Sequence, residues 1–143
     1  MVKRTTAKTI LVIEDDPSQQ NFLCRVLELE GYHVIKAGDG LTGITLLKNN
    51  PVDLILLDMR LPGPDGWSIL REIKGRKEFS QIPIIVITAI ADSVQRRRTI
   101  RMGAAQYLIK PLSAHKLSKT VADMLKQTVN IHHAAREHAL CLK

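Results

Sequence analysis

The stretch DLILLDMRLPGPDG, residues 53–66, decides the fold of this chain. Residues 53–57 are predominantly apolar and have the length of a buried strand, and Asp58 follows them directly. Two prolines and two glycines come next, within residues 61–66, so no helix begins immediately after the acid. The stretch therefore predicts a buried strand that carries a carboxylate to its end, beneath a stiff loop.

The rest of the chain alternates strand-like and helix-like segments in the same way. Short apolar runs alternate with segments of helical spacing, and such alternation predicts an α/β protein with a parallel sheet covered by helices on both faces. The 39–50 helix is expected to turn Leu41, Ile44, Leu46 and Leu47 inward. The expected strands are 9–15, 32–37, 52–58, 82–89 and 105–111, and the expected helices are 17–31, 39–50, 64–76, 93–103 and 114–127.

Composition indicates one soluble globular domain. The 143 residues are 45% apolar and 24% charged. Cys24 and Cys141 form no metal-type spacing and suggest reduced, intracellular thiols. No apolar run approaches the roughly 20 residues that span a bilayer. The expected location is the cytoplasm, with no membrane partner.

The chain has a net charge of +7, and its tightest cluster of basic residues is RRRTIR, residues 96–101. Three interpretations of these arginines stay open: a solvated face, a docking face for a protein, and a DNA-binding face. The last is the least favoured, because no helix-turn-helix, zinc pattern or aromatic interleaving accompanies them. Direct binding of nucleic acid is therefore not expected.

Reactive side chains gather at the carboxyl ends of the expected strands: Glu14, Asp15, Asp58, Thr88 and Lys110. In an open parallel sheet these ends form one rim, where the working site lies. Carboxylates crowded together recruit a hard cation, and Mg²⁺ fits oxygen ligands while leaving room for a phosphate oxygen. A hydroxyl and an ammonium beside it suit a phosphoryl group. Asp58 is the candidate nucleophile, since aspartate accepts phosphoryl as an acyl phosphate.

With these motifs the sequence resembles the receiver domains of bacterial two-component response regulators, of the chemotaxis-regulator type, over residues 9 to about 127. The matching segments are LVIEDD, LLDMRLPGPDG, ITA and YLIKP. Spacing agrees too, because Asp58 precedes Thr88 by 30 positions and Thr88 precedes Lys110 by 22 (88 − 58 and 110 − 88). The resemblance implies a doubly wound, flavodoxin-like, five-stranded parallel sheet of strand order 2-1-3-4-5, with five helices and a C-terminal extension.

For the acidic residues the resemblance implies a metal site and a phosphoacceptor. Asp15 would bind Mg²⁺ directly, Glu14 would bind it through water, and Arg60 would offer its backbone carbonyl. Asp58 would also be a ligand, and would accept the phosphoryl group of a phosphohistidine on a sensor histidine kinase or a histidine phosphotransfer protein. The protein would be a phosphoacceptor that promotes its own phosphorylation, not an enzyme with turnover.

For the remaining site residues the resemblance implies a switch. Thr88 would hydrogen-bond one phosphoryl oxygen, Lys110 would pair with another, and the bond from Lys110 to Pro111 would be cis. Tyr107 matches the aromatic residue that turns inward as Thr88 moves. The output would be the face of the fourth helix, fifth strand and fifth helix, toward a protein target or in a phosphorylation-dependent homodimer, which favours the protein-docking interpretation of the arginines.

Two positions beside the expected phosphoryl group suggest a long-lived phosphorylated state. Ile90, two residues after Thr88, would exclude water, and Arg60, two after Asp58, could screen the anion. The hypothesis is slow self-dephosphorylation.

Two other functions are less favoured. GDGLTG, residues 38–43, spells the dinucleotide-binding pattern G-x-G-x-x-G, but the expected second strand is an edge strand and a turn before a helix explains the glycines better. A phosphatase or phosphotransferase with a nucleophilic aspartate usually needs a second acid two residues later, where this chain has Arg60.

The two ends carry little information. Residues 1–8 form a basic segment, 9–127 the receiver domain, and 128–143 either a longer fifth helix, a short extra helix or a linker. The protein acts alone, or its output domain lies elsewhere; the sequence leaves both open.

Overall fold

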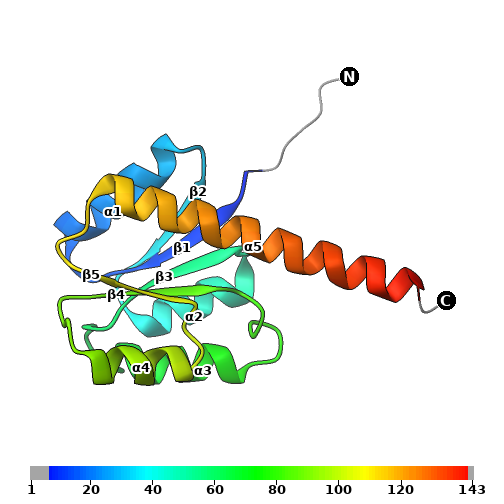
Figure 1. Cartoon of the computed structure of the whole chain (residues 1–143). Coiled ribbons are helices and arrows are strands. Elements are labelled where there is room, and N and C mark those ends of the chain that lie inside the picture. Colours follow the sequence, from blue (N-terminus) through cyan, green and yellow to red (C-terminus); the bar gives the residue numbers. More distant parts are fainter. Residues whose placement is uncertain (1–6, 142–143) are drawn as a thin grey trace.

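Five parallel strands form a single sheet in the order β2-β1-β3-β4-β5, which confirms the predicted fold class (Figure 1). The computed structural model describes residues 7–141, and side chains for residues 7–127. Because β1 starts in the middle and the chain winds outward to both edges, the winding direction reverses beside β1 and β3. The strands are β1 (Thr9–Ile13), β2 (His33–Ala37), β3 (Leu54–Asp58), β4 (Ile84–Thr88) and β5 (Gln106–Ile109).

Helices cover both faces of this sheet (Figure 1). Helices α1 (Pro17–Leu29) and α5 (Ala114–Cys141) pack on one face. Helices α2 (Gly40–Asn49), α3 (Gly66–Gly75) and α4 (Ser93–Arg101) lie on the other. No helix in the described part of the chain has the length and apolar character needed to cross a membrane.

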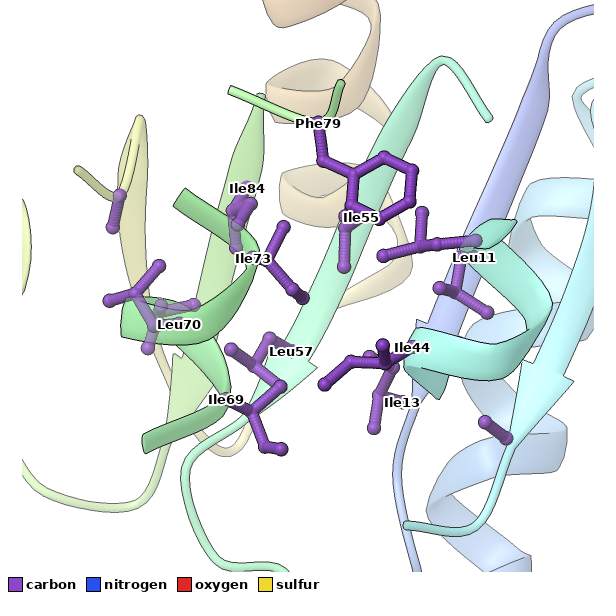
Figure 2. Packing of buried hydrophobic residues seen from close by; sticks show 14 of the residues in the cluster. Leu11, Ile13, Ile44, Ile55, Leu57, Ile69, Leu70, Ile73, Phe79 and Ile84 are labelled. Carbon is purple, nitrogen blue, oxygen red and sulfur yellow. The ribbon is translucent and has the colours of Figure 1, made fainter. Parts of the chain in front are cut away.

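The central strands are apolar throughout because each face has its own core. Leu11 and Ile13 of β1 and Leu57 of β3 point to α2 and α3 (Figure 2). The intervening residues Val12 and Leu56 point to α1 and α5. All five side chains are essentially inaccessible, and burying one such side chain stabilises the fold by about 1.5–3 kcal/mol. The two cores fix the register of β1 and β3, and with it the position of the residues at their ends.

Two glycines of the G-x-G-x-x-G pattern are required by packing. A Cβ on Gly40 would lie 2.2 Å from Ile69 Cγ1, and one on Gly43 would lie 2.6 Å from Ile13 Cδ1. The first glycine, Gly38, has open space around it. Asp39 caps α2 by accepting a hydrogen bond from the Thr42 N–H, at 2.8 Å. The pattern is therefore the start of a helix packed against the core.

Two details of the core differ from the sequence analysis. The inward orientation predicted for Leu41 is wrong, since the side chain is 57% exposed while Ile44 and Leu47 fill the core. Phe79 in the loop after α3 is buried, although its segment shows no helical or strand period. At the C-terminal end α5 continues to Cys141, the first of the three possibilities left open for this segment.

Replacing Gly40 by alanine is expected to lower the free energy of unfolding by about 1–3 kcal/mol, because the added methyl overlaps Ile69 in a filled core. Gly38→Ala is the matched control and is expected to change it by less than about 0.5 kcal/mol. Urea denaturation of both variants measures the difference. Equal stability of the two would contradict the close approach of α2 to α3.

Candidate functional site

Three carboxylates meet where β1 and β3 end. Asp58 is the last residue of β3, and Glu14 and Asp15 directly follow β1. One oxygen from each of the three carboxylates lies within 4.8 Å of the others. Glu14 is 1% exposed and Asp58 6%, whereas Asp15 is exposed. Two acids are thus held at the edge of the core and one faces solvent.

Lys110 joins the two buried acids. Its Nζ lies 2.9 Å from Glu14 Oε1 and 2.9 Å from Asp58 Oδ2. Parallel pairing brings it there, because the Lys110 N–H donates to the Thr88 carbonyl and so extends β5 alongside β4. Burial alone lowers the pKa of Lys110, but the two carboxylates raise it above its ordinary value. The ammonium therefore stays charged.

The two buried acids differ in their affinity for protons. Burial, together with the nearby Asp58 carboxylate, raises the pKa of Glu14 to about 8. Burial also acts to raise the pKa of Asp58, but the neighbouring Glu14 carboxyl, the Arg60 N–H and Lys110 lower it below its ordinary value. Asp58 is therefore the ionised carboxylate of the pair, as a nucleophile must be.

The acidic cluster could hold a metal ion. Glu14 Oε2 is buried and has no hydrogen-bond partner among the described residues, so one acceptor in the cluster is unsatisfied there. An oxygen-only set of three carboxylates is the donor set preferred by hard cations such as Mg²⁺. A cation would satisfy the buried oxygen and relieve the repulsion among the acids.

The loop after Asp58 folds back onto the strand that carries it. The Arg60 N–H donates to Asp58 Oδ1 at 2.9 Å, which fixes the carboxylate. The Gly66 N–H donates to the Met59 carbonyl at 3.1 Å, and a Cβ on Gly66 would lie 2.5 Å from Met59 Cα. Asp65 then caps α3 by accepting from the Ser68 N–H. The prolines and glycines thus allow a tight return of the chain that leaves the Asp58 side chain at the rim.

Thr88 and Tyr107 meet at the backbone of Ile90. Thr88, the last residue of β4, is 2% exposed, and its Oγ1 accepts from the Ile90 N–H at 3.2 Å. The Tyr107 hydroxyl donates to the Ile90 carbonyl at 2.7 Å. Tyr107 is 6% exposed, and burial raises its pKa. Among the described residues, Thr88 forms no hydrogen bond with Asp58, although their strands are neighbours.

The predicted site residues therefore form two groups. Lys110 joins Glu14 and Asp58, with Asp15 beside them, while Thr88 and Tyr107 share the Ile90 backbone. The Arg60 N–H contacts Asp58, and the role expected of its carbonyl stays a prediction. The bond from Lys110 to Pro111 is cis, as expected.

Gln20 is a residue of the site that the sequence did not indicate. Its side-chain amide donates to the carbonyls of Glu14 (3.0 Å) and Ala37 (3.3 Å), so α1 holds the turn that carries the acids. Its place one turn into the first helix was the only signal available, and many polar residues share it.

The geometry agrees with comparisons to known proteins. Residues 10–122 match the family model described as the response regulator receiver domain, and the chain belongs to this family. Among curated proteins it is 36% identical over 123 residues to the probable transcriptional regulator ycf27 of Cyanophora paradoxa, covering 86% of this chain and 50% of that protein. It is 33% identical over 116 residues to protein PilH of Pseudomonas aeruginosa, covering 81% of this chain and 96% of PilH. The chain spans about half the length of the transcriptional regulators it matches.

Solved structures show the same fold. A CheY-like receiver domain from Methanospirillum hungatei superposes with a TM-score of 0.81 at 26% identity, covering 87% of this chain and 98% of that one. The receiver domain of a sensor histidine kinase from Pseudomonas aeruginosa superposes with a TM-score of 0.78 at 31% identity, covering 85% and 99%. That second structure is described with a magnesium ion coordinated in its active site cleft.

Removing the Lys110 ammonium is expected to destabilise the metal-free protein. Lys110→Ala would leave Glu14 and Asp58 buried without a cation, at a cost of about 3 kcal/mol. Lys119→Ala is the control, since its 3.8 Å pair with Asp123 is exposed and its loss should cost less than about 1 kcal/mol. Chemical denaturation in the presence of a chelator compares them, and a Lys110 variant as stable as the control would contradict the role given to this cation.

Proposed function

We propose that this protein is a phosphorylation-dependent signalling switch, in which Asp58 accepts a phosphoryl group from a phosphohistidine. The observation that carries the proposal is the position of Asp58 at the rim of the sheet, beside Glu14 and Asp15 and 2.9 Å from the Lys110 ammonium. The donor would be a sensor histidine kinase or a histidine phosphotransfer protein in the cytoplasm. The switching unit would comprise residues 9–127.

Mg²⁺ would be held by Glu14, Asp15, Asp58 and the Arg60 carbonyl. The unsatisfied Oε2 of Glu14 and the three converging carboxylates support this assignment. When bound, the ion would neutralise charge on the phosphoryl oxygens and on the attacking carboxylate. Glu14 must lose its proton before it can act as a ligand, because its metal-free pKa is about 8.

In the transfer step, an Asp58 oxygen attacks phosphorus and the bond from phosphorus to the histidine nitrogen breaks. The bonding electrons stay on the imidazole, and Asp58 becomes an acyl phosphate. Lys110, released from carboxylate pairing, binds a phosphoryl oxygen. A groove of about 580 Å³ whose lining includes Phe22, Lys110 and Pro111 adjoins this position, and it gives the donor room to approach.

Phosphorylation would act through Thr88 and Tyr107. The new group adds close to two negative charges beside the end of β4. A Thr88 hydroxyl that turns toward the phosphoryl group gives up its bond with the Ile90 N–H, and the Ile90 carbonyl also holds Tyr107. The output surface would be the α4–β5–α5 face, where Ile100 is 42% exposed and Ile109 40%. Its partner would be a protein target or a second copy of this chain.

Asp58→Asn is expected to abolish phosphorylation, because an amide cannot form the acyl phosphate. The wild-type protein treated with acetyl phosphate should gain one phosphoryl group by intact mass, and should gain none once the divalent cation is chelated. Asp123→Asn, an exposed acid on α5, is the control and should label normally.

Two results would reject the proposal. Labelling of Asp58→Asn at the wild-type level would place the acceptor elsewhere. Continuous release of phosphate from a phosphate ester would identify an enzyme with turnover, the alternative described above.

The acyl phosphate is expected to decay slowly, over minutes or longer. Ile90 is half-buried and apolar, and both of its backbone polar groups are bonded, so it would limit the approach of water. Ile90→Gln is expected to speed decay about tenfold, which corresponds to a barrier lower by about 1.4 kcal/mol. Timed acid-quenched measurements after removal of the phosphodonor give the rates. Loss of the wild-type label within seconds would reject slow dephosphorylation.

A further inference from the structure

Helix α4 carries a cluster of positive charge that takes no part in the Asp58 site. Arg96, Arg97, Arg98 and Arg101 are all exposed. In the described part of the chain none of them forms an ion pair, whereas Arg76 pairs with Glu72 and Lys119 with Asp123. Like charges one turn apart on a helix destabilise it by a few tenths of a kcal/mol per pair. An anionic ligand would remove this repulsion.

Three of these arginines line a groove. The groove is open to solvent, has a volume of about 500 Å³, and is lined by Val94, Arg97, Arg98, Arg101 and Met102. These positions follow one another at helical spacing and so share one side of α4. Val94 is 66% exposed, so the groove offers apolar surface as well as charge. No carboxylate belongs to its lining.

Arg98 is stacked on the neighbouring helix. Its guanidinium carbon lies 4.0 Å from the centroid of the Trp67 ring, which is on α3. A guanidinium at this distance over indole is held by cation–π attraction, so the position of the Arg98 guanidinium beside the groove is restricted. Guanidinium planes and aromatic rings are the surfaces on which proteins stack nucleobases.

We propose that the α4 groove, defined by Val94, Arg97, Arg98, Arg101 and Met102, binds the phosphate and base of a nucleotide. Arg97 and Arg101 bind phosphate oxygens, for which the guanidinium fork is suited. The base lies against Arg98 and the adjoining apolar surface. The nucleotide is either free or part of a single-stranded nucleic acid, since both present the same groups.

An acidic protein segment fits the groove less well. Carboxylates alone would satisfy the charge but would leave the exposed Val94 and the stacked Arg98 without a function. A nucleotide would use the arginine charge, the apolar surface of Val94 and the face of the Arg98 guanidinium. The groove shares no residue with the Asp58 cluster, so nucleotide binding can be tested in protein that is not phosphorylated.

The fluorescence of Trp67 provides the test, because it is the only tryptophan in the chain. We expect ADP, GDP or UDP, titrated at low ionic strength in the presence of a chelator, to change this fluorescence saturably. The best of them should bind at least about tenfold more tightly than inorganic pyrophosphate, a difference of about 1.4 kcal/mol for the nucleoside. Asp58→Asn should bind equally well.

Matched variants locate the site. The double variant Arg97→Ala/Arg101→Ala should weaken binding at least about tenfold, by loss of two phosphate contacts. Lys116→Ala/Lys119→Ala removes the same charge from exposed positions of α5 and should leave affinity within about twofold at matched salt. Arg98→Lys keeps the positive charge but removes the planar guanidinium. The affinity of this variant for the nucleotide should fall to its affinity for pyrophosphate. Circular dichroism checks that each variant is folded.

The alternatives have distinct outcomes. Tighter binding of a single-stranded deoxyadenosine hexamer than of ADP supports the proposal with nucleic acid as the source, and the reverse supports a free nucleotide. No response to any nucleotide, or pyrophosphate binding as tightly as the nucleotide, overturns the proposal. Displacement of the nucleotide by hexaglutamate at equal concentration also overturns it, in favour of an acidic protein partner.

Discussion

The contact on which the site depends is the one between Lys110 and the two buried carboxylates, Glu14 and Asp58. Two such charges a few ångströms apart repel by several kcal/mol at an effective dielectric constant near 20. A fold that buries them at adjacent strand ends must supply a cation or a proton, and this one supplies both: an ammonium 2.9 Å from each acid, and a raised pKa for Glu14. The order β2-β1-β3-β4-β5 makes this possible, because it brings the ends of distant strands to one rim.

The same arrangement makes the site responsive to a new anion. Lys110 is engaged by carboxylates in this state, so a phosphoryl group on Asp58 competes for it. Thr88 is engaged by the Ile90 N–H, so the same group competes for that hydroxyl. Ile90 stands two residues before Asp92, the cap of α4, and its carbonyl holds Tyr107. One short backbone segment therefore connects Thr88 and Tyr107 to the start of α4.

Much of this could be predicted from the sequence, for identifiable reasons. The central strands could be predicted because both of their faces are covered, so nearly every residue in them is apolar. The ends of these strands could then be located without any knowledge of side-chain packing. The orientation of Leu41 could not be predicted, because Leu41, Ile44 and Leu47 fit one helical stripe equally well in the sequence, and only the packed structure shows that Leu41 lies outside the core. The stacking of Arg98 on Trp67 was also hidden, since it joins two helices about 30 residues apart (98 − 67 = 31) whose relative position only the sheet determines.

The distribution of charge bears on the three interpretations of the arginines in residues 96–101. The acids of the proposed phosphorylation site lie at strand ends beside a lysine, while four of the 21 basic residues lie together on one nine-residue helix. A solvated face needs no particular shape, and lysine would serve it as well as arginine. Three arginines around a concave surface, one of them stacked on an indole, form instead a geometry suited to planar and forked partners. Helix α4 begins just after Ile90, so a ligand in this groove would contact the same helix that phosphorylation is proposed to move. A change in the position of α4 on phosphorylation would change the affinity for that ligand. By thermodynamic linkage, the ligand would then change the equilibrium for phosphorylation of Asp58 by the same factor.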